Sequence, residues 1–490
     1  MKVAVVGAGY AGLGTARMLL RCGFQVTVFD RAPDVGGVWS RTRRYPGLRT
    51  QNDKRTYAFS ELPMPPHYPE WPSGEQVQRY LDSYVAVFGL GPVLRLDTEV
   101  VSAELGEHGW TLVTGPTRET HTFDHLVVAN GIFSRPAVPV YPGRTEFEAA
   151  GGRVCATSEF VELEQARDRD VVVVGYGKSA CDVAVAVSGV ARSTAVVARR
   201  LLWKMPRRLG GVLNYKYLLL TRMGEGLFPY LRPTRFEKLL HGPGSGGTQV
   251  MLGTVQNAVV RQLDLQRLGL VPDGSFDQIA RSTVSLVTEE FFERVADGTL
   301  RVHRDETVSE LCAVDGRPHA RLGSGRTVPA DLVLCGTGFD QQVPFFSPDL
   351  IARLQDDRGN FVLYRHILPP DVPRLTFAGY NSSFFSPLGA EMAAAWIAAH
   401  LLGGLDLPPA EEMRAQVGEH LRWMEQFSAG KHARGTSVIP FSMHNIDEVL
   451  SDLLLDVGPL TKARQWLLPV DPSSYRDVGT RLLRKHGLES

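Results

Sequence analysis

The chain has 490 residues, a formal net charge of zero and 43% hydrophobic residues. This length predicts two or three domains, and the neutral charge balance provides no global field that would attract nucleic acid or an anionic membrane. Five scattered cysteines without a C-x-x-C pair argue against a disulfide framework, a zinc site or a dithiol redox centre. No secretory signal precedes the first strand at Val3. We therefore expect a soluble cytoplasmic protein that binds no metal, nucleic acid or membrane.

Residues 1–30 predict a β-α-β unit around a glycine turn. The stretch VAVVGAGYAGLGTARML places an apolar strand before Gly7-x-Gly9-x-x-Gly12 and a helix directly after it. Gly7 allows the tight turn, Gly9 lets the backbone approach a pyrophosphate, and Gly12 lets helix and strand pack closely. Phosphates would meet free N–H groups at the helix N-terminus, where the dipole favours negative charge. The alternative is a glycine turn that holds no ligand.

The middle of the chain predicts a change of domain. A loop-rich stretch containing LPMPPHYPEWPSGE leads to a helix in EQVQRYLDSYVAVFGL and then to a β-rich region. The segment DHLVVANGIFSRPAVP has a late counterpart in ADLVLCGTGFD. We expect each of the two segments to carry the chain across a hinge.

Residues 170–200 repeat the first unit with informative differences. VVVVGYGKSACDVA again places an apolar strand before a turn, here with Gly175 and Gly177. Ala180 replaces the third glycine, which is a small change for the packing, and Ser179 can offer its hydroxyl to a phosphate.

The ends of the two second strands differ in charge. Asp30 closes the first one, close to the spacing of about 20 residues at which an acidic side chain accepts ribose hydroxyls. Arg199 and Arg200 stand at the matching place in the second copy, where a guanidinium can bind a 2′-phosphate. The first turn therefore suits FAD and the second suits NADPH, although the two arginines could instead form a solvated basic edge.

These patterns together predict an α/β protein with two Rossmann-like dinucleotide-binding domains, the NADPH domain inserted into the FAD domain. We place the first part of the FAD domain at residues 1–164 and the NADPH domain at 165–335, with a mostly helical insert at about 205–285. Residues 336–490 complete the FAD domain and add a C-terminal region. Within it, AEMAAAWIAAHLLGGL predicts a packed helix that is too short to span a bilayer.

Several motifs, in this order along nearly the whole chain, resemble the class B flavin-dependent monooxygenases, which include flavin-containing and Baeyer–Villiger monooxygenases. GAGYAG resembles the FAD turn of the family, GGVW its flavin-side motif, and YPGLRTQNDKRTYAFSELPMP the stretch that lines flavin and nicotinamide. GYGKSACDVA resembles the NADPH turn, ARRLLWKMPR the arginine-containing specificity segment, CGTGF the linker, and HNIDEVLSDLLLDVG a C-terminal stretch.

The resemblance implies FAD and NADPH as cofactors and extends the set of candidate residues. Beyond the glycines and charged residues above, the expected cofactor-binding residues are Tyr10, Ala11, Gly37, Val38, Trp39, Thr50, Lys178 and Thr337. The expected catalytic residues are Gln51 and Asn52, whose amides could instead satisfy loop backbone groups. Trp39 could likewise be an ordinary core residue. The stretch NSSFFSPLG is expected either to line the substrate pocket or to form a loop at the flavin edge.

The chain also departs from the family pattern. In AGGRVCATSEF, Gly152 and Phe160 fit the diagnostic motif, but Ala150 stands at its aromatic position and Ala156 at its histidine. Phe160 in place of tryptophan favours the flavin-containing monooxygenase branch. Gln51 carries an amide where Baeyer–Villiger members have a carboxylate, which fits a neutral flavin hydroperoxide better than a peroxyanion.

The implied function is an NADPH- and FAD-dependent monooxygenase that inserts one oxygen atom of O₂ into a small molecule through a flavin hydroperoxide. N- or S-oxygenation is the leading expectation. The alternatives are Baeyer–Villiger oxidation of a ketone, a flavin NADPH oxidase or reductase, and a nucleotide sensor without turnover. The partners are the substrate and O₂, with a homodimer as an open option.

Overall fold

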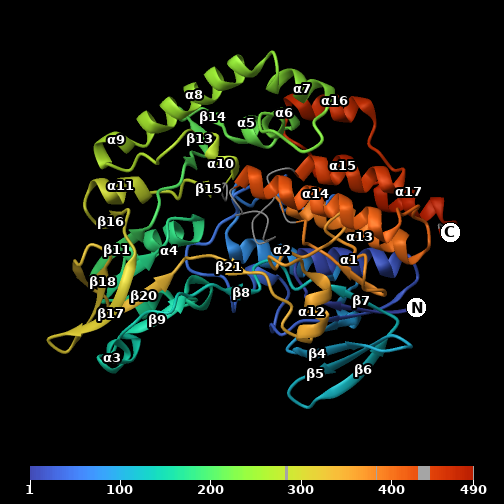
Figure 1. Ribbon diagram of the computed structural model, residues 1–490, viewed down its shortest axis with the longest axis horizontal. Coiled ribbons are helices and arrows are strands. Elements are labelled where there is room, and N and C mark those ends of the chain that lie inside the picture. The colour runs from blue at the N-terminus through green and yellow to red at the C-terminus, as the bar shows by residue number, and fades with distance from the viewer. Residues whose placement is uncertain (282–284, 382, 429–441, 489–490) are drawn as a thin grey trace.

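The computed structural model describes residues 1–281, 285–381, 383–428 and 442–488. Two lobes, each built on a parallel sheet, stand side by side, and helices of the insert and of the C-terminal region arch over them (Figure 1).

The first lobe is built on a five-stranded parallel sheet. Its order is β22 (Leu375–Phe377), β7 (His125–Val128), β1 (Lys2–Val6), β2 (Gln25–Phe29) and β3 (Leu94–Arg95). Residues 3–5 are fully buried at the centre of the sheet. Helix α1 (Tyr10–Arg21) packs against α13 (Ser386–Leu401), the packed helix that the sequence predicts. Since α13 is buried on nearly every face, it is held by its neighbours and not by an amphipathic stripe.

The second lobe repeats this architecture. Its parallel sheet has the order β16 (Leu300–Arg304), β11 (Ser193–Ala198), β10 (Asp170–Val174), β20 (Leu332–Cys335) and β9 (Arg153–Ala156). Helices α4 (Lys178–Ser188) and α11 (Phe291–Ala296) pack on it. Strand β9 already belongs to this sheet, so the chain enters the second lobe before the expected boundary at residue 165. The sequence pattern could not predict this, because the sheet to which a four-residue strand belongs is decided by its pairing partner, here β20.

Smaller elements complete both lobes. The first carries α2 (Gly74–Val87), α12 (Pro348–Leu354) and the antiparallel sheet β4 (Val100–Leu105), β5 (Trp110–Thr114) and β6 (Glu119–Phe123). The second carries α3 (Arg144–Ala149) and the antiparallel sheet β17 (Val308–Val314), β18 (Arg317–Leu322) and β19 (Thr327–Pro329).

The two crossings between the lobes lie next to each other. Strand β8 (Arg135–Pro136) on the outward crossing pairs antiparallel with β21 (Phe339–Asp340) on the return. Asn130 Nδ2 donates to the Gln342 carbonyl at 2.7 Å and Ser134 Oγ to the Asp340 carbonyl at 3.2 Å. The two segments that the sequence singled out as crossings therefore run together as one double connection.

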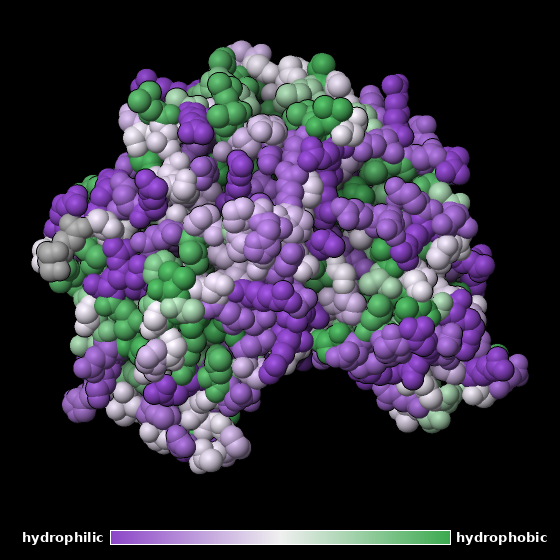
Figure 2. All heavy atoms as spheres, turned by 180° about the vertical axis from the view of Figure 1, so that it is seen from behind, coloured by the Kyte–Doolittle hydropathy of each residue, from purple (hydrophilic) through white to green (hydrophobic). Residues whose placement is uncertain are grey.

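The insert is mostly helical, as expected. It comprises β12 (Lys204–Met205), β13 (Arg208–Leu209), β14 (Leu213–Asn214), α5 (Lys216–Leu219), α6 (Arg222–Gly226), α7 (Arg235–His241), α8 (Ser245–Gln262), α9 (Leu265–Leu268), α10 (Gln278–Arg281) and β15 (Ser285–Leu286). Seen from behind, apolar atoms gather along the upper edge of the molecule, where α7 and α8 lie (Figure 2). Leu239 of α7 and Val250 of α8 are exposed. Among the described helices, none combines the length and the apolar character that crossing a bilayer requires.

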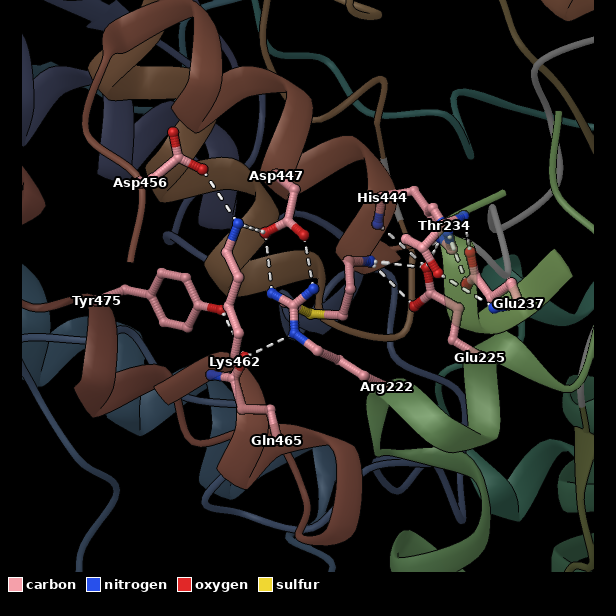
Figure 3. A network of polar contacts seen from close by, with 11 residues as sticks. Arg222, Glu225, Thr234, Glu237, His444, Asp447, Asp456, Lys462, Gln465 and Tyr475 are labelled. Atoms are coloured by element: carbon pink, nitrogen blue, oxygen red, sulfur yellow. Dashed lines mark hydrogen bonds and ion pairs between the residues drawn. The ribbon is translucent and has the colours of Figure 1, made fainter. Parts of the chain in front are cut away.

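Polar and charged side chains join the insert to α15 (Ser442–Leu453) and α16 (Pro459–Leu467) of the C-terminal region (Figure 3). That region also contains α14 (Ala410–Ser428) and α17 (Val478–Lys485). Arg222 of α6 forms a two-pronged pair with Asp447 at 2.6 and 2.9 Å. His444 lies between two buried carboxylates, with Nδ1 2.7 Å from Glu225 and Nε2 2.9 Å from Glu237. This network joins the insert to the C-terminal helices, although in sequence the insert lies between β11 and β16 of the second lobe.

Candidate nucleotide-binding and active site

A single cavity of about 2550 Å³ runs between the two lobes and reaches both glycine turns. Gly7, Gly9, Tyr10 and Ala11 line one end, together with Asp30. The other end is lined by Gly175, Gly177, Lys178, Ser179, Arg199, Arg200 and Thr337. The two turns, far apart in the sequence, therefore open into one space.

The first turn has the close packing that the glycines predict. A Cβ at Gly12 would lie 1.8 Å from the Gly7 carbonyl oxygen, so only glycine fits where α1 leaves the sheet. Gly7 has a φ of +119°, which L side chains rarely adopt. Gly9 forms the N-cap of α1 and no side chain caps the helix, so the first N–H groups of α1 remain available for an anion. Gly12 itself is buried behind the cavity wall and acts through packing alone.

In the second turn the helix also packs closely on the strand, but the alanine lies on the helix and the glycine faces it. Ala180 occupies the helix position of Gly12, and the residue that faces it is Gly336, where a Cβ would lie 2.7 Å from the Ala180 Cβ. In the first turn the facing residue is Ala129, whose Cβ would be 3.5 Å from a Cβ at Gly12. Each helix–sheet contact thus holds one methyl group. Ala180 is fully buried and, like Gly12, supports the turn without lining the cavity.

The two strand ends carry the expected opposite charges. The Asp30 carboxylate lines the cavity and accepts N–H groups from Ala8 at 2.6 Å and Ala32 at 2.8 Å, which fixes its orientation. Arg199 and Arg200 are exposed and line the cavity, and neither has a salt-bridge partner within the described part of the chain. Two unpaired guanidinium groups beside a helix N-terminus are a favourable environment for an anion.

Lys178 has a more specific arrangement than the sequence predicts. Its Nζ pairs with Asp182 one turn further along α4 and lies 3.4 Å from Thr288 Oγ1. Tyr45, from the first lobe, donates to the other oxygen of Asp182 at 3.3 Å. Burial lowers the pKa of Lys178, and Asp182 opposes this effect. The result is a buried polar junction between the lobes that also forms part of the cavity wall.

Gln51 and Asn52 both line the cavity and both hold neighbouring backbone. Gln51 Oε1 accepts the Leu286 N–H at 3.1 Å, and its own carbonyl accepts the Tyr215 hydroxyl. Asn52 Nδ2 donates to the Phe384 carbonyl. The alternative role of satisfying loop backbone therefore holds for one end of each amide, while both side chains remain in the wall.

The remaining predicted residues lie around the first turn, except Thr337, which lies beside the second. Gly37, Val38 and Trp39 line the cavity, and Trp39 is buried and packs edge-on against Tyr57 at 5.6 Å. Thr337 Oγ1 donates to the Ala137 carbonyl at 2.6 Å. Thr50 is buried behind the wall, and its hydroxyl has no hydrogen-bond partner among the described residues.

Other cavity residues escaped the sequence analysis. Arg43 lines the cavity and donates to the Phe133 carbonyl at 2.6 Å, and burial lowers its pKa. Tyr57, Asn130 and Trp203 also belong to the wall. Arg43 lies outside every quoted motif. Tyr57, Asn130 and Trp203 lie within quoted stretches, but nothing in those stretches singles them out from their neighbours.

The structure shows what surrounds the positions at which the chain departs from the diagnostic family motif. A Cβ at Gly152 would lie 2.4 Å from the ring of Phe147, so an aromatic ring does pack on this glycine, although Ala150 stands at the expected aromatic position. Phe160 is fully buried, whereas Thr157, Ser158 and Glu159 line the cavity. Ala156, which stands at the position of the family histidine, ends β9 and offers only a methyl group there.

A protein-family model described as flavin-binding monooxygenase-like matches residues 1–453. The chain belongs to this family. It is therefore an oxidoreductase, a flavin-dependent monooxygenase, and the resemblance noted from the motifs is confirmed.

Named relatives agree with this assignment. Dimethylaniline monooxygenase (N-oxide-forming) 4 of Mus musculus is 26% identical over 442 residues, which cover 85% of this chain and 72% of that protein. The structure of S-allyl-L-cysteine S-oxygenase from Allium sativum has a TM-score of 0.62 at 21% identity and covers 99% of this chain and 97% of that one. OTEMO, solved in complex with FAD and NADP, has a TM-score of 0.68 at 17% identity, covering 92% and 98%. The structures support the expected two-domain fold.

Proposed function

We propose that the protein is an NADPH- and FAD-dependent monooxygenase that oxygenates a nitrogen or sulfur atom of a small molecule. The observation that carries this proposal is the single cavity with a carboxylate-terminated turn at one end and an arginine-terminated turn at the other. A ribose with free hydroxyls suits Asp30, and a 2′-phosphate suits Arg199 and Arg200. The relatives named above act on an amine and on a thioether, which favours the same two substrate classes.

The residues present fit a flavin dinucleotide at the first turn. The uncapped start of α1 would hold its pyrophosphate, Asp30 its ribose, and Gly37, Val38 and Trp39 would pack beside it. The buried Thr50 hydroxyl without a partner among the described residues is an unused hydrogen-bonding group behind this wall. Bound flavin would supply the redox chemistry.

The protein groups would position the reactants and exclude water. Ser179 and the uncapped start of α4 would hold the phosphates of NADPH, with Thr337 nearby. Gln51 and Asn52 would orient the reacting partners through amide groups that their backbone contacts hold in place. Phe384, in the NSSFFSPLG stretch, lies in the cavity wall, where it suits an apolar substrate with one polar handle.

The proposal is tested by removing the arginine pair. In an R199A/R200A variant, the Michaelis constant for NADPH should rise about tenfold or more, since a charge-assisted contact is worth about 1.5–3 kcal/mol. The constant for NADH should hardly change. Arg169→Ala, at an exposed arginine outside the cavity, is the matched control.

The reaction type is tested with a tertiary amine, a thioether and a cyclic ketone. We expect stoichiometric N-oxide or sulfoxide per NADPH oxidised. Lactone formation alone would replace the proposal by Baeyer–Villiger oxidation, and hydrogen peroxide without product would replace it by an oxidase. Equal effects of the double variant on NADPH and NADH would refute the 2′-phosphate assignment.

A further inference from the structure

Residues 285–288, which we call the strap, connect the two ends of the cavity. The strap includes β15 and lies between the insert and the second lobe. Ser285 and Leu286 are almost completely buried, and Thr288 is 8% exposed. Val287 is partly exposed. The polar groups of the three buried residues must be satisfied by the surrounding protein.

One end of the strap holds the candidate catalytic amide. The Leu286 N–H donates to Gln51 Oε1 at 3.1 Å. Lys204 Nζ donates to Ser285 Oγ at 3.2 Å, and the Val287 N–H donates to the Met205 carbonyl at 3.0 Å, so β12 holds the strap from the side. A shift of the strap therefore moves the group that orients Gln51.

The other end of the strap joins the junction beside the second glycine turn. Thr288 Oγ1 donates to Asp182 Oδ1 at 2.5 Å and lies 3.4 Å from Lys178 Nζ. Lys178 lines the cavity in the first turn of α4, where nucleotide phosphates are expected. Asp182 is its carboxylate partner, and Lys204 and Arg207 add positive charge nearby.

We propose that Thr288 is a positioning residue that couples nucleotide binding at the second glycine turn to the orientation of Gln51. This inference rests on the proposed function, because it takes NADP(H) as the ligand of that turn.

The physical basis is competition for Lys178. A phosphate at the start of α4 draws the ammonium group toward itself and weakens its pairing with Asp182. The buried carboxylate then depends on the Tyr45 and Thr288 hydroxyls, which strengthens its hold on Thr288. Leu286, two residues away on the same buried strap, transmits this shift to Gln51.

Coupling through such a chain of contacts is reciprocal. If nucleotide binding shifts the orientation of Gln51, then the orientation of Gln51 changes the affinity for the nucleotide by the same free energy. The strap would carry this coupling, so a variant of the strap should weaken the response of the flavin site to the nucleotide. A purely structural role of Thr288 would change stability without changing this response.

The first test uses the flavin-loaded protein and NADP⁺. In the wild type, NADP⁺ should produce a difference spectrum in the flavin absorption bands. In Thr288→Val, calorimetry should show NADP⁺ affinity within about threefold of wild type, while the flavin response falls by at least half. Thr288→Ser, which retains the hydroxyl, should restore the response. Thr194→Val is the matched control, because Thr194 is buried in β11 and its hydroxyl has no partner among the described residues.

The second test needs no variant. Hydrogen exchange of the Leu286 amide in the flavin-loaded wild type should change by at least threefold when NADP⁺ is added. Unchanged exchange, or an equal flavin response in wild type and Thr288→Val, would overturn the coupling. Failure of the wild type to bind flavin or NADP⁺ would instead overturn the proposed function, and the coupling with it.

Discussion

The helix–strand contact at the second glycine turn has room for one methyl group, and this predicts how substitutions there change the free energy of unfolding. Gly336 directly follows β20 and faces Ala180 of α4 so closely that a Cβ on Gly336 would lie 2.7 Å from the Ala180 Cβ and 3.0 Å from its Cα. Gly336→Ala should destabilise the protein by about 1–3 kcal/mol, the usual cost of overpacking a tight contact. Since Gly336 has no positive φ, the effect is steric and not conformational.

The compensating change is Ala180→Gly, which reproduces the first turn. Alone it should cost about 1 kcal/mol, because glycine is less favourable than alanine in a helix. In the double variant the methyl–methyl clash is gone, so the loss should be about 1–2 kcal/mol smaller than the sum of the single losses, within the range of coupling between contacting residues. The rescue should be incomplete, because the new methyl group at position 336 would still meet the backbone of α4 at 3.0 Å.

Urea-induced unfolding of the two single variants and the double variant, followed by circular dichroism without nucleotide, measures this coupling. Gly253→Ala in α8 is the control, since a Cβ there meets nothing within 4 Å and should not destabilise the protein. Losses that add within about 0.5 kcal/mol would show that the two positions do not interact and that the contact is not limited to one methyl group.

The shifted pKa values of two buried groups, His444 and Glu391, lead us to expect that stability depends on pH. Burial opposes charge on His444, but hydrogen bonds to Glu225 and Glu237 outweigh it and raise its pKa from 6.5 to about 10. Its contribution is therefore complete below pH 6.5 and is lost as the pH rises through 10, so His444→Gln should lower the melting temperature at pH 7 and flatten its decline toward pH 10. Burial raises the pKa of Glu391 from 4.5 to about 8, so stability falls as the pH rises through that range. Glu391→Gln, which can still hydrogen-bond Ser60, should raise the melting temperature at pH 9, and an unchanged or lower value there would contradict a protonated Glu391 in the native state.

The sequence by itself determined the repeated strand–turn–helix elements. An apolar strand, a glycine turn and a helix are local features, so both strand–turn–helix units could be predicted from the sequence pattern alone. The opposite charges of Asp30 and Arg199 could be predicted in the same way, because each stands at a defined strand end. The motif order along the chain then identified the family before any contact was known.

Only the tertiary structure decided how these parts meet. Strand β9 joins the second sheet through β20, and Arg43 and Tyr57 reach the cavity through packing between segments distant in sequence. The strap is four residues without a recognisable pattern, and its role depends on hydrogen bonds to Gln51 and Asp182 from two different lobes. Such contacts are set by the closure of the whole fold, and no local periodicity or spacing in the chain encodes them.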